Sequence, residues 1–192
     1  MTAGLRAPSS TRLLADQLAA ATARALQPVE VLDLPVIELR EHAHALTDAL
    51  LTGFASGDLA RALATVRDAD AVIVVTPVFR ASYSGLFKTF VDVLEDGALD
   101  RTPVLLGATG GTARHSLALE YALRPLFAYL RAAVVPTSVF AAGEDLGAGT
   151  ELTERVERAA GELADAVRLR PRRARPDPFE DPTPFAELLR GR

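Results

Sequence analysis

Three segments of the chain combine hydroxyl, glycine and arginine residues in the manner of loops that bind phosphates or flat rings. In the first, Arg6, Ser9, Thr11 and Arg12 stand just before a predicted helix. Hydroxyls and amides at a helix N-terminus bind phosphate, helped by the helix dipole and by arginine. The segment has no Walker lysine and no G-x-G-x-x-G spacing, which argues against a nucleoside triphosphatase and against a dinucleotide fingerprint. Ser-Ser-Thr is also ordinary helix capping, so the segment alone leaves both interpretations open.

The second segment follows an apolar run, 71–75, which ends at Thr76-Pro77. A polar loop with one aromatic residue and one arginine comes next, and a helix is predicted to open at Ser84-Gly85. The proline cannot extend a strand ladder and fixes its own backbone, so the loop should leave the sheet in a defined direction. The glycine lets the backbone approach a planar ring and supplies amides at a helix start. This pattern predicts a flat aromatic ligand at the carboxyl end of a strand.

The third segment, 107–113, again lies between a predicted strand and a predicted helix. Its adjacent Gly110 and Gly111 permit positive φ angles and expose a row of amides. Such donors could stabilise negative charge on the carbonyl edge of a ring as it is reduced. The alternative is a tight turn in which Thr112 caps the following helix.

The elements that must position these loops alternate between strand and helix. Short valine-rich runs at 71–75, at 104–108 and at 134–135 with 138–140 suit parallel strands buried on both faces, and the alternating run 29–34 suits an edge strand. We therefore predict an α/β fold, a flavodoxin-like doubly wound five-stranded parallel sheet of order 2-1-3-4-5 with helices on both faces. The three loops would then meet at the carboxyl edge of the sheet. Helices are predicted at 11–26, 59–66, 86–94, 113–132 and 151–169.

The two ends of the chain depart from this plan. Only Met1–Ala3 are available for the central first strand, so either this strand is very short or the true start lies upstream. We predict one domain over 1–172 and a proline-rich tail over 173–192, because dense prolines prevent regular structure. The tail is either partly ordered or anchored on a neighbouring subunit or partner by four apolar side chains, those of Phe179, Phe185, Leu188 and Leu189.

Composition excludes several classes of protein. The 192 residues contain no cysteine, which excludes disulfides, thiol nucleophiles, iron–sulfur clusters and cysteine zinc sites. A net charge of −4 gives no reason to expect nucleic acid. No apolar run approaches the roughly 18 residues of a membrane span, and the start does not have a signal-peptide layout, so we expect a cytoplasmic protein.

The three histidines do not suggest a metal site. His42 and His44 are two residues apart on a predicted helix, so they do not face one ion. His115 either lines the pocket or packs beside the glycine turn. We predict no metal site and no catalytic side-chain acid or base.

Tyr121 and Pro125 predict an irregular helix. Proline at 125 cannot donate to the carbonyl of residue 121, and its ring crowds that carbonyl. A kink or a single π turn should therefore lie near Tyr121. The alternative is a simple proline kink with a tyrosine in the core.

The segments 76–89, 108–115 and 121–125 together resemble the NAD(P)H-dependent FMN reductases. The resemblance covers about residues 4–145, and it is best to the branch that supplies reduced flavin to two-component monooxygenases of the alkanesulfonate type. It implies that the first loop holds the FMN phosphate, that the second runs beside the isoalloxazine and that the third meets its pyrimidine edge. It also implies that Arg80 faces the phosphates of the nicotinamide nucleotide, and that Tyr121 marks a π-helical insertion at a tetramer interface that keeps flavin exchangeable. The implied cofactor-binding residues are Arg6, Ser9, Thr11, Arg12, Pro77, Val78, Phe79, Arg80, Ser82, Tyr83, Ser84, Gly85, Thr109, Gly110 and Gly111.

By that resemblance the chain is an oxidoreductase that passes hydride from C4 of NADPH or NADH to N5 of FMN, with the cofactors carrying the chemistry. Its partners would be a flavin, a nicotinamide nucleotide, a flavin-dependent monooxygenase and copies of itself in a tetramer or dimer. One alternative keeps FMN bound and reduces quinones, azo compounds or chromate. A one-electron carrier like flavodoxin is disfavoured, because the chain lacks tryptophan and is only modestly acidic.

Overall fold

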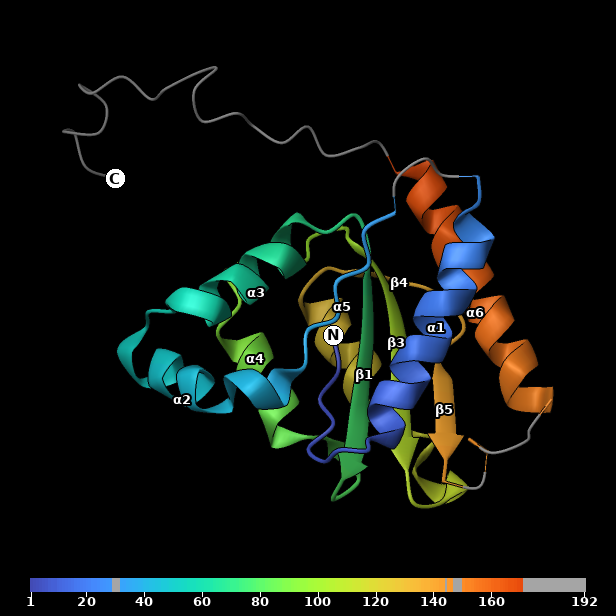
Figure 1. Cartoon of the computed structure of the whole chain (residues 1–192), viewed down its shortest axis with the longest axis horizontal. Coiled ribbons are helices and arrows are strands. Elements are labelled where there is room, and N and C mark those ends of the chain that lie inside the picture. Colours follow the sequence, from blue (N-terminus) through green and yellow to red (C-terminus); the bar gives the residue numbers. More distant parts are fainter. Residues whose placement is uncertain (29–31, 144, 147–149, 171–192) are drawn as a thin grey trace.

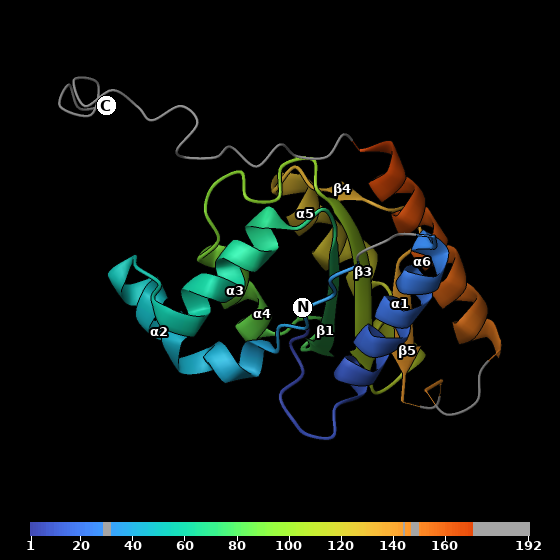
Figure 2. The same ribbon diagram turned by 45° about the horizontal axis from the view of Figure 1, so that its top comes forward.

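The computed structural model describes residues 1–28, 32–143, 145–146 and 150–170. A central sheet is covered by helices on both faces (Figures 1 and 2). On one face lie α1 (Ser10–Leu26) and α6 (Thr150–Leu169); on the other lie α2 (Ala43–Thr52), α3 (Gly57–Asp68), α4 (Gly85–Asp92) and α5 (Arg124–Tyr129). The strands are β1 (Val72–Phe79), β2 (Ser82–Tyr83), β3 (Pro103–Gly110), β4 (Ala133–Val134) and β5 (Val139–Ala142). The mixed α/β class and the two helical layers are as predicted.

The sheet is built around the parallel pair β1 and β3, whose register runs from Val72 opposite Val104 to Pro77 opposite Thr109. β4 pairs with the start of β3 and β5 with its end, both in parallel. The short β2 pairs antiparallel with β1. The path is therefore β2-β1-β3-β4, with β5 also on β3.

The amino end of the chain adds a minimal strand to this sheet. Thr2 forms isolated parallel bridges to Val75 on one side and to Glu38 on the other. Within the described residues the predicted edge strand 29–34 is not seen, since 32–34 have no strand structure and 29–31 lie outside the described residues. The predicted order 2-1-3-4-5 is thus not confirmed, because the amino end contributes isolated bridges at Thr2 rather than a regular strand.

Both faces of the central strands are buried, as the continuous apolar runs predicted. Val74 and Leu106 belong to the core under α2, α4 and α5. Val75 and Leu105, their neighbours in sequence, belong to the core under α1 and α6. Successive residues of a strand point to opposite faces, so a doubly covered strand must be apolar throughout.

Pro77 does not end its strand, in contrast to our expectation. The N–H and C=O of Val75 both bond the amino-terminal segment, to Met1 O and Ala3 N. Pro77 has no N–H with which to extend this pairing. β1 nevertheless runs on to Phe79, because β3 pairs with it through Pro77 and β2 pairs with it at Val78 and Phe79.

The predicted helix 113–132 is interrupted. It consists of a short 3-10 turn, Ala113–His115, then a π-helix, Leu119–Leu123, then α5. The N–H of Arg124 bonds Leu119 O, five residues back. The predicted π turn near Tyr121 is thus confirmed, and the alternative with a core tyrosine is wrong, since Tyr121 is 78% exposed. The tail 173–192 and its apolar anchors lie outside the described residues.

Candidate functional site

The three loops predicted to bind a ligand meet at the carboxyl edge of the sheet. Thr11 Oγ1 lies 2.9 Å from Thr109 Oγ1, which joins the first loop to the third. Pro77, in the second segment, stands opposite Thr109 in the register of β1 and β3. Figure 1 shows the three chain reversals at the same end of the molecule, where the arrows of β1 and β5 end.

The first loop closes on itself through Gly4 and Ser9. Ser9 Oγ accepts a hydrogen bond of 3.2 Å from Arg12 N and so caps α1. A Cβ on Gly4 would lie 2.1 Å from Ser9 Oγ, so only glycine fits beneath this cap. The capping interpretation is therefore confirmed, and the N–H groups of the first turn that remain without an intrahelical acceptor still face the loop.

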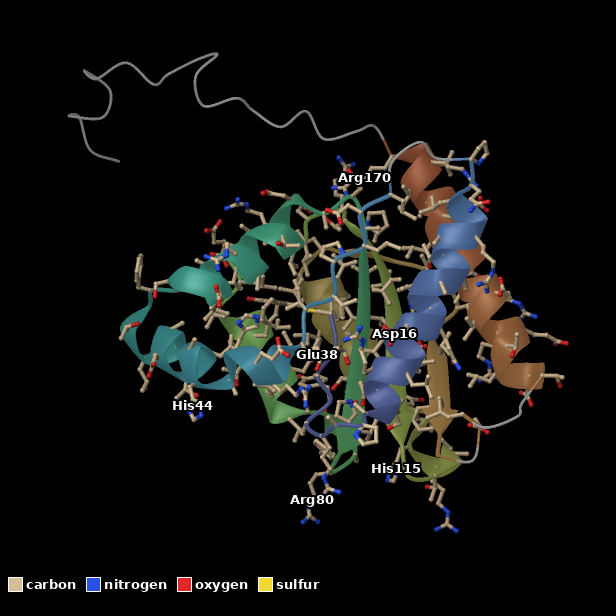
Figure 3. The ribbon with its side chains drawn as sticks, viewed as in Figure 1. Asp16, Glu38, His44, Arg80, His115 and Arg170 are labelled. Atoms are coloured by element: carbon tan, nitrogen blue, oxygen red, sulfur yellow. The ribbon has the colours of Figure 1, made fainter. Side chains whose placement is uncertain are left out.

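Arg12 is engaged by two carboxylates. Its guanidinium bonds Glu38 Oε1 at 2.5 Å and Asp16 Oδ1 at 2.8 Å, and Arg40 Nε bonds the other oxygen of Glu38 at 2.8 Å. Figure 3 shows Asp16 on α1 and Glu38 on the neighbouring segment. Burial alone would raise the pKa of Glu38, but the hydrogen bonds from Arg12 and Arg40 outweigh it and lower the pKa. A phosphate role for Arg12 stays a prediction, and it would compete with Glu38.

The second segment is a β-hairpin rather than an open loop. Phe79 pairs with Ser82, and Arg80 and Ala81 form the two-residue turn between them with φ angles of 51° and 66°. Two-residue hairpin turns with positive φ at both positions normally use Asn-Gly, because other side chains are strained there. Arg80 is consequently held at the tip, pointing away from the molecule (Figure 3). The sequence carries no signal for this turn.

Several of the remaining side chains of the second segment hydrogen-bond or pack within the fold. Ser84 is buried; its Oγ caps α4 by accepting from Phe87 N, and its own N–H bonds Thr76 Oγ1. The Tyr83 ring packs edge-on against Phe87, with centroids 5.7 Å apart. Gly85 is exposed, and a Cβ built there meets nothing within 4 Å. Pro77 and Val78 are half-buried and Phe79 is 45% exposed, so this wall offers apolar surface at the rim.

The two glycines of the third loop serve different purposes. Neither adopts the positive φ that glycine permits; the positive-φ glycines of the described residues are elsewhere. A Cβ on Gly110 would lie 2.8 Å from Phe140 Cζ and 3.4 Å from His115 Cβ, so packing requires glycine there. A Cβ on Gly111 would meet nothing within 4 Å. Thr112 makes no side-chain cap, so the capping alternative is not seen.

His115 is exposed beside Gly110, and it points outward at the same end as Arg80 (Figure 3). It therefore lies next to the third loop without being enclosed. Thr109, in contrast, is 3% exposed with its hydroxyl turned to Thr11. Its side chain links two loops, which leaves its backbone as the part that can face a ligand.

The hydrogen-bond donors and the apolar surface of these loops suit flavin mononucleotide. The helix N-terminus of α1, the serine cap and the exposed Arg6 suit a dianionic phosphate. The exposed Phe79, the open Gly85 and the open Gly111 leave a flat apolar and amide-bearing surface beside it. No group of histidine, aspartate and glutamate among the described residues could hold a metal ion.

A separate hollow of about 250 Å³ lies away from these loops. It is bounded by the segment after α2, by α3 and by the segment after α4. It contains none of the predicted site residues, and the ion pair between Arg67 and Glu95 borders it.

No helix in the described part of the chain is long and apolar enough to cross a membrane.

Comparisons with known proteins agree on one family. A sequence model of the family described as NADPH-dependent FMN reductase matches residues 1–147. The chain is 40% identical over 142 residues to an FMN reductase (NADPH) of Pseudomonas aeruginosa, covering 74% of each chain. It is 38% identical over 176 residues to the NADH-dependent FMN reductase SfnE of Pseudomonas putida, covering 92% of this chain and 89% of that one.

Solved structures give the same result for the fold. An oxidoreductase from Corynebacterium diphtheriae superposes with a TM-score of 0.85 at 46% identity, covering 88% of this chain and 95% of that one. A flavodoxin, WrbA-like protein from Agrobacterium tumefaciens superposes with a TM-score of 0.60 at 17% identity, over 83% and 90% of the two chains. The second likeness concerns the fold alone, which is flavodoxin-like.

Proposed function

The chain belongs to the NADPH-dependent FMN reductase family, and from this premise we propose that the rim described above is where it binds FMN and reduces it with NADPH or NADH. The observation that carries the proposal is the buried hydroxyl pair of Thr11 and Thr109, which holds a phosphate-type loop against a ring-type loop. The chain is thus an NAD(P)H:FMN oxidoreductase, and the proposal concerns how its residues serve that activity.

We assign the flavin phosphate to the first loop. Arg6, the amides at the start of α1 and the hydroxyls there would neutralise and bond it, with Arg12 as a further donor. Arg6 is exposed, and no ion pair of the described residues involves it, whereas the charge of Arg12 is shared with Glu38 and Asp16. We therefore expect Arg6 to contribute more than Arg12.

We assign the ring to the second and third loops. Pro77, Val78 and Phe79 would supply an apolar edge, and Ser82, Tyr83, Ser84 and Gly85 would complete that wall through their backbone. The amides around Thr109, Gly110 and Gly111 would meet the polar edge of the ring, where negative charge increases on reduction. The bound flavin supplies the hydride acceptor; the protein orients the two cofactors and excludes water between them.

The amide donors make a titrating side chain unnecessary for this reaction. His115 is exposed and beside the third loop, yet the transfer needs no proton from it in the assignment above. The rate of hydride transfer should accordingly depend on cofactor placement rather than on one ionisable group.

We further propose that FMN leaves after reduction and is delivered to a flavin-dependent monooxygenase, and that the protein works as a homotetramer. Both rest on the resemblance at residues 121–125, now supported by the π-helix Leu119–Leu123 with its exposed tyrosine. We also propose the sheet order 2-1-3-4-5, in which Glu38 and Thr2 stand where the first two strands would pair. A cytoplasmic location stays a prediction of the sequence.

The decisive experiment titrates the purified protein with FMN and then follows NADPH and NADH oxidation with free FMN as acceptor. We expect saturable FMN binding and sequential initial-rate patterns in which FMN behaves as a substrate. Ping-pong kinetics with FMN retained through gel filtration, and with quinones as good acceptors, would instead establish the alternative with a bound flavin. Absence of both FMN binding and NAD(P)H oxidation would contradict the proposed function.

A further inference from the structure

The three loops of the site carry positive charge and no carboxylate, on a chain that is negative as a whole. The segments 4–11, 76–89 and 107–118 contain no aspartate or glutamate, although the net charge of the protein is −4. They contain Arg6, Arg80 and Arg114, one on each loop, all exposed. A local field of sign opposite to the net charge concentrates anions at that surface.

Among the described residues, no ion pair neutralises the charge of these three arginines. Away from the rim, arginines bond carboxylates on every helical layer, as Arg24 does with Glu157 and Arg124 with Glu120. None of the ion pairs found among the described residues involves Arg6, Arg80 or Arg114, whereas Arg12 of the first loop is paired with Glu38 and Asp16. Lys88, in the second segment, is paired with Asp92 at 2.5 Å and adds little.

The two arginines of the ring-binding loops are fixed by their backbones. Arg80 is held at the tip of the β1–β2 hairpin with a φ of 51°. Arg114 lies in the 3-10 turn Ala113–His115, where His115 N bonds Thr112 O at 3.3 Å and His115 packs over Gly110. Because Pro77 and Thr109 are register partners, these turns follow directly from neighbouring strands. Figure 3 shows Arg80 and His115, the neighbour of Arg114, extending from the same end.

We propose that Arg114 is a binding residue for the nicotinamide nucleotide and that, with Arg80, it holds a phosphate group of that substrate. The proposal rests on the proposed function, which gives Arg6 and the start of α1 to the flavin phosphate. A second anionic substrate then needs its own cations, and Arg80 and Arg114 are the two that remain on the rim. Guanidinium groups bond phosphate oxygens in pairs, which suits both the pyrophosphate and a 2′-phosphate.

The test measures Arg114→Ala, Arg80→Ala and the parent with NADPH and with NADH, and also measures NADP⁺ binding calorimetrically in the presence of FMN. We expect Arg114→Ala to raise the KM for NADPH and the Kd for NADP⁺ about tenfold, which corresponds to about 1.4 kcal/mol. The turnover number and the Kd for FMN should stay within about twofold. Arg114→Lys should recover part of the loss, because it keeps the charge without the paired geometry.

Arg158→Ala is the matched control, since Arg158 is exposed on α6 and takes part in none of the ion pairs found among the described residues. It should leave every constant unchanged. An equal loss with both nucleotides assigns Arg114 to the pyrophosphate, and a loss confined to NADPH assigns it to the 2′-phosphate; either supports the proposal.

An active parent whose Arg114→Ala variant binds NADP⁺ and both reduced nucleotides as before overturns this inference alone. A parent that neither binds FMN nor oxidises NADPH overturns the proposed function instead. The two failures are thus distinguishable.

Discussion

Thr11 and Thr109 lie far apart in the sequence but share a buried hydrogen bond of 2.9 Å between their hydroxyl oxygens. Their side chains are only 2% and 3% exposed. The bond connects the first turn of α1, where the first loop ends, to the end of β3, where the third loop begins. It therefore fixes the distance between the loop proposed to hold the phosphate and the loop proposed to meet the ring.

Thr109→Val should lower the stability of the protein and also weaken the link between the first and third loops. Valine keeps the shape but leaves the Thr11 hydroxyl buried without its partner, which costs about 1–2 kcal/mol of unfolding free energy. The Thr11→Val/Thr109→Val double variant should recover part of this loss, because both polar groups are then gone. Urea unfolding of the four proteins gives the coupling energy. Strictly additive single effects would show that the two hydroxyls do not depend on each other.

Gly110 and Gly111 should respond differently to alanine. Gly110→Ala places a methyl group 2.8 Å from Phe140 Cζ and should cost about 1–3 kcal/mol of stability through overpacking. Gly111→Ala enters open space and should unfold like the parent. If the ring of FMN lies against this backbone, Gly111→Ala should nonetheless weaken FMN binding about tenfold. Unchanged FMN affinity in a folded Gly111→Ala variant would remove Gly111 from the site.

The sequence predicted the parts of this site that depend on local patterns. Continuous apolar runs predicted β1 and β3, because doubly covered strands cannot alternate. Pro125 predicted a kink or π turn near Tyr121, found as the π-helix Leu119–Leu123, because a missing N–H at a known position has a local consequence. Ser84 was predicted at a helix start and is found capping α4.

The predictions that were wrong or missing concern features that depend on tertiary contacts. Pro77 stays within β1 because β3 pairs with the strand through Pro77 and β2 pairs with it just afterwards, which only the sheet can show. Gly110 is required by Phe140, thirty residues later, rather than by its own φ angle. The engagement of Arg12 by Glu38 likewise joins segments whose pairing no spacing reveals.

Ala81→Gly should stabilise the protein while preserving the hairpin. Ala81 has a φ of 66°, a conformation that costs an L-residue roughly 1–2 kcal/mol and glycine almost nothing. The greater freedom of glycine in the unfolded chain offsets part of this gain, so we expect a net increase of about 0.5–1 kcal/mol. Ala81→Val should instead lose at least about 1 kcal/mol, because a β-branched side chain is worse there. Chemical denaturation measures both, and a loss on Ala81→Gly would contradict the strain argument.

The Arg12–Glu38–Arg40 network should make stability depend on pH in one direction. The pKa of Glu38 is lower in the folded protein, so the network stabilises above the unfolded pKa of roughly 4.3 and is lost as pH falls through the lower folded value. Glu38→Gln should therefore cost about 1–2 kcal/mol near pH 7 and progressively less as the pH is lowered through the folded pKa. Glu151→Gln, which breaks an exposed pair with Arg155, is the control and should cost under about 0.5 kcal/mol throughout. A Glu38→Gln deficit that is constant over this pH range would show that packing, not charge, is responsible.

Tyr121→Ala should reduce the size of the assembly without unfolding the chain. Tyr121 is 78% exposed on the π-helix Leu119–Leu123, and a large aromatic ring held at the surface by irregular backbone is typical of an interface anchor. Sedimentation velocity should show a tetramer for the parent and smaller species for the variant. Leu51→Ala, at a side chain 80% exposed on α2, should leave the parent distribution unchanged. A parent that sediments as a monomer, or a Tyr121→Ala variant that sediments like the parent, would show that the π turn does not mark an assembly interface.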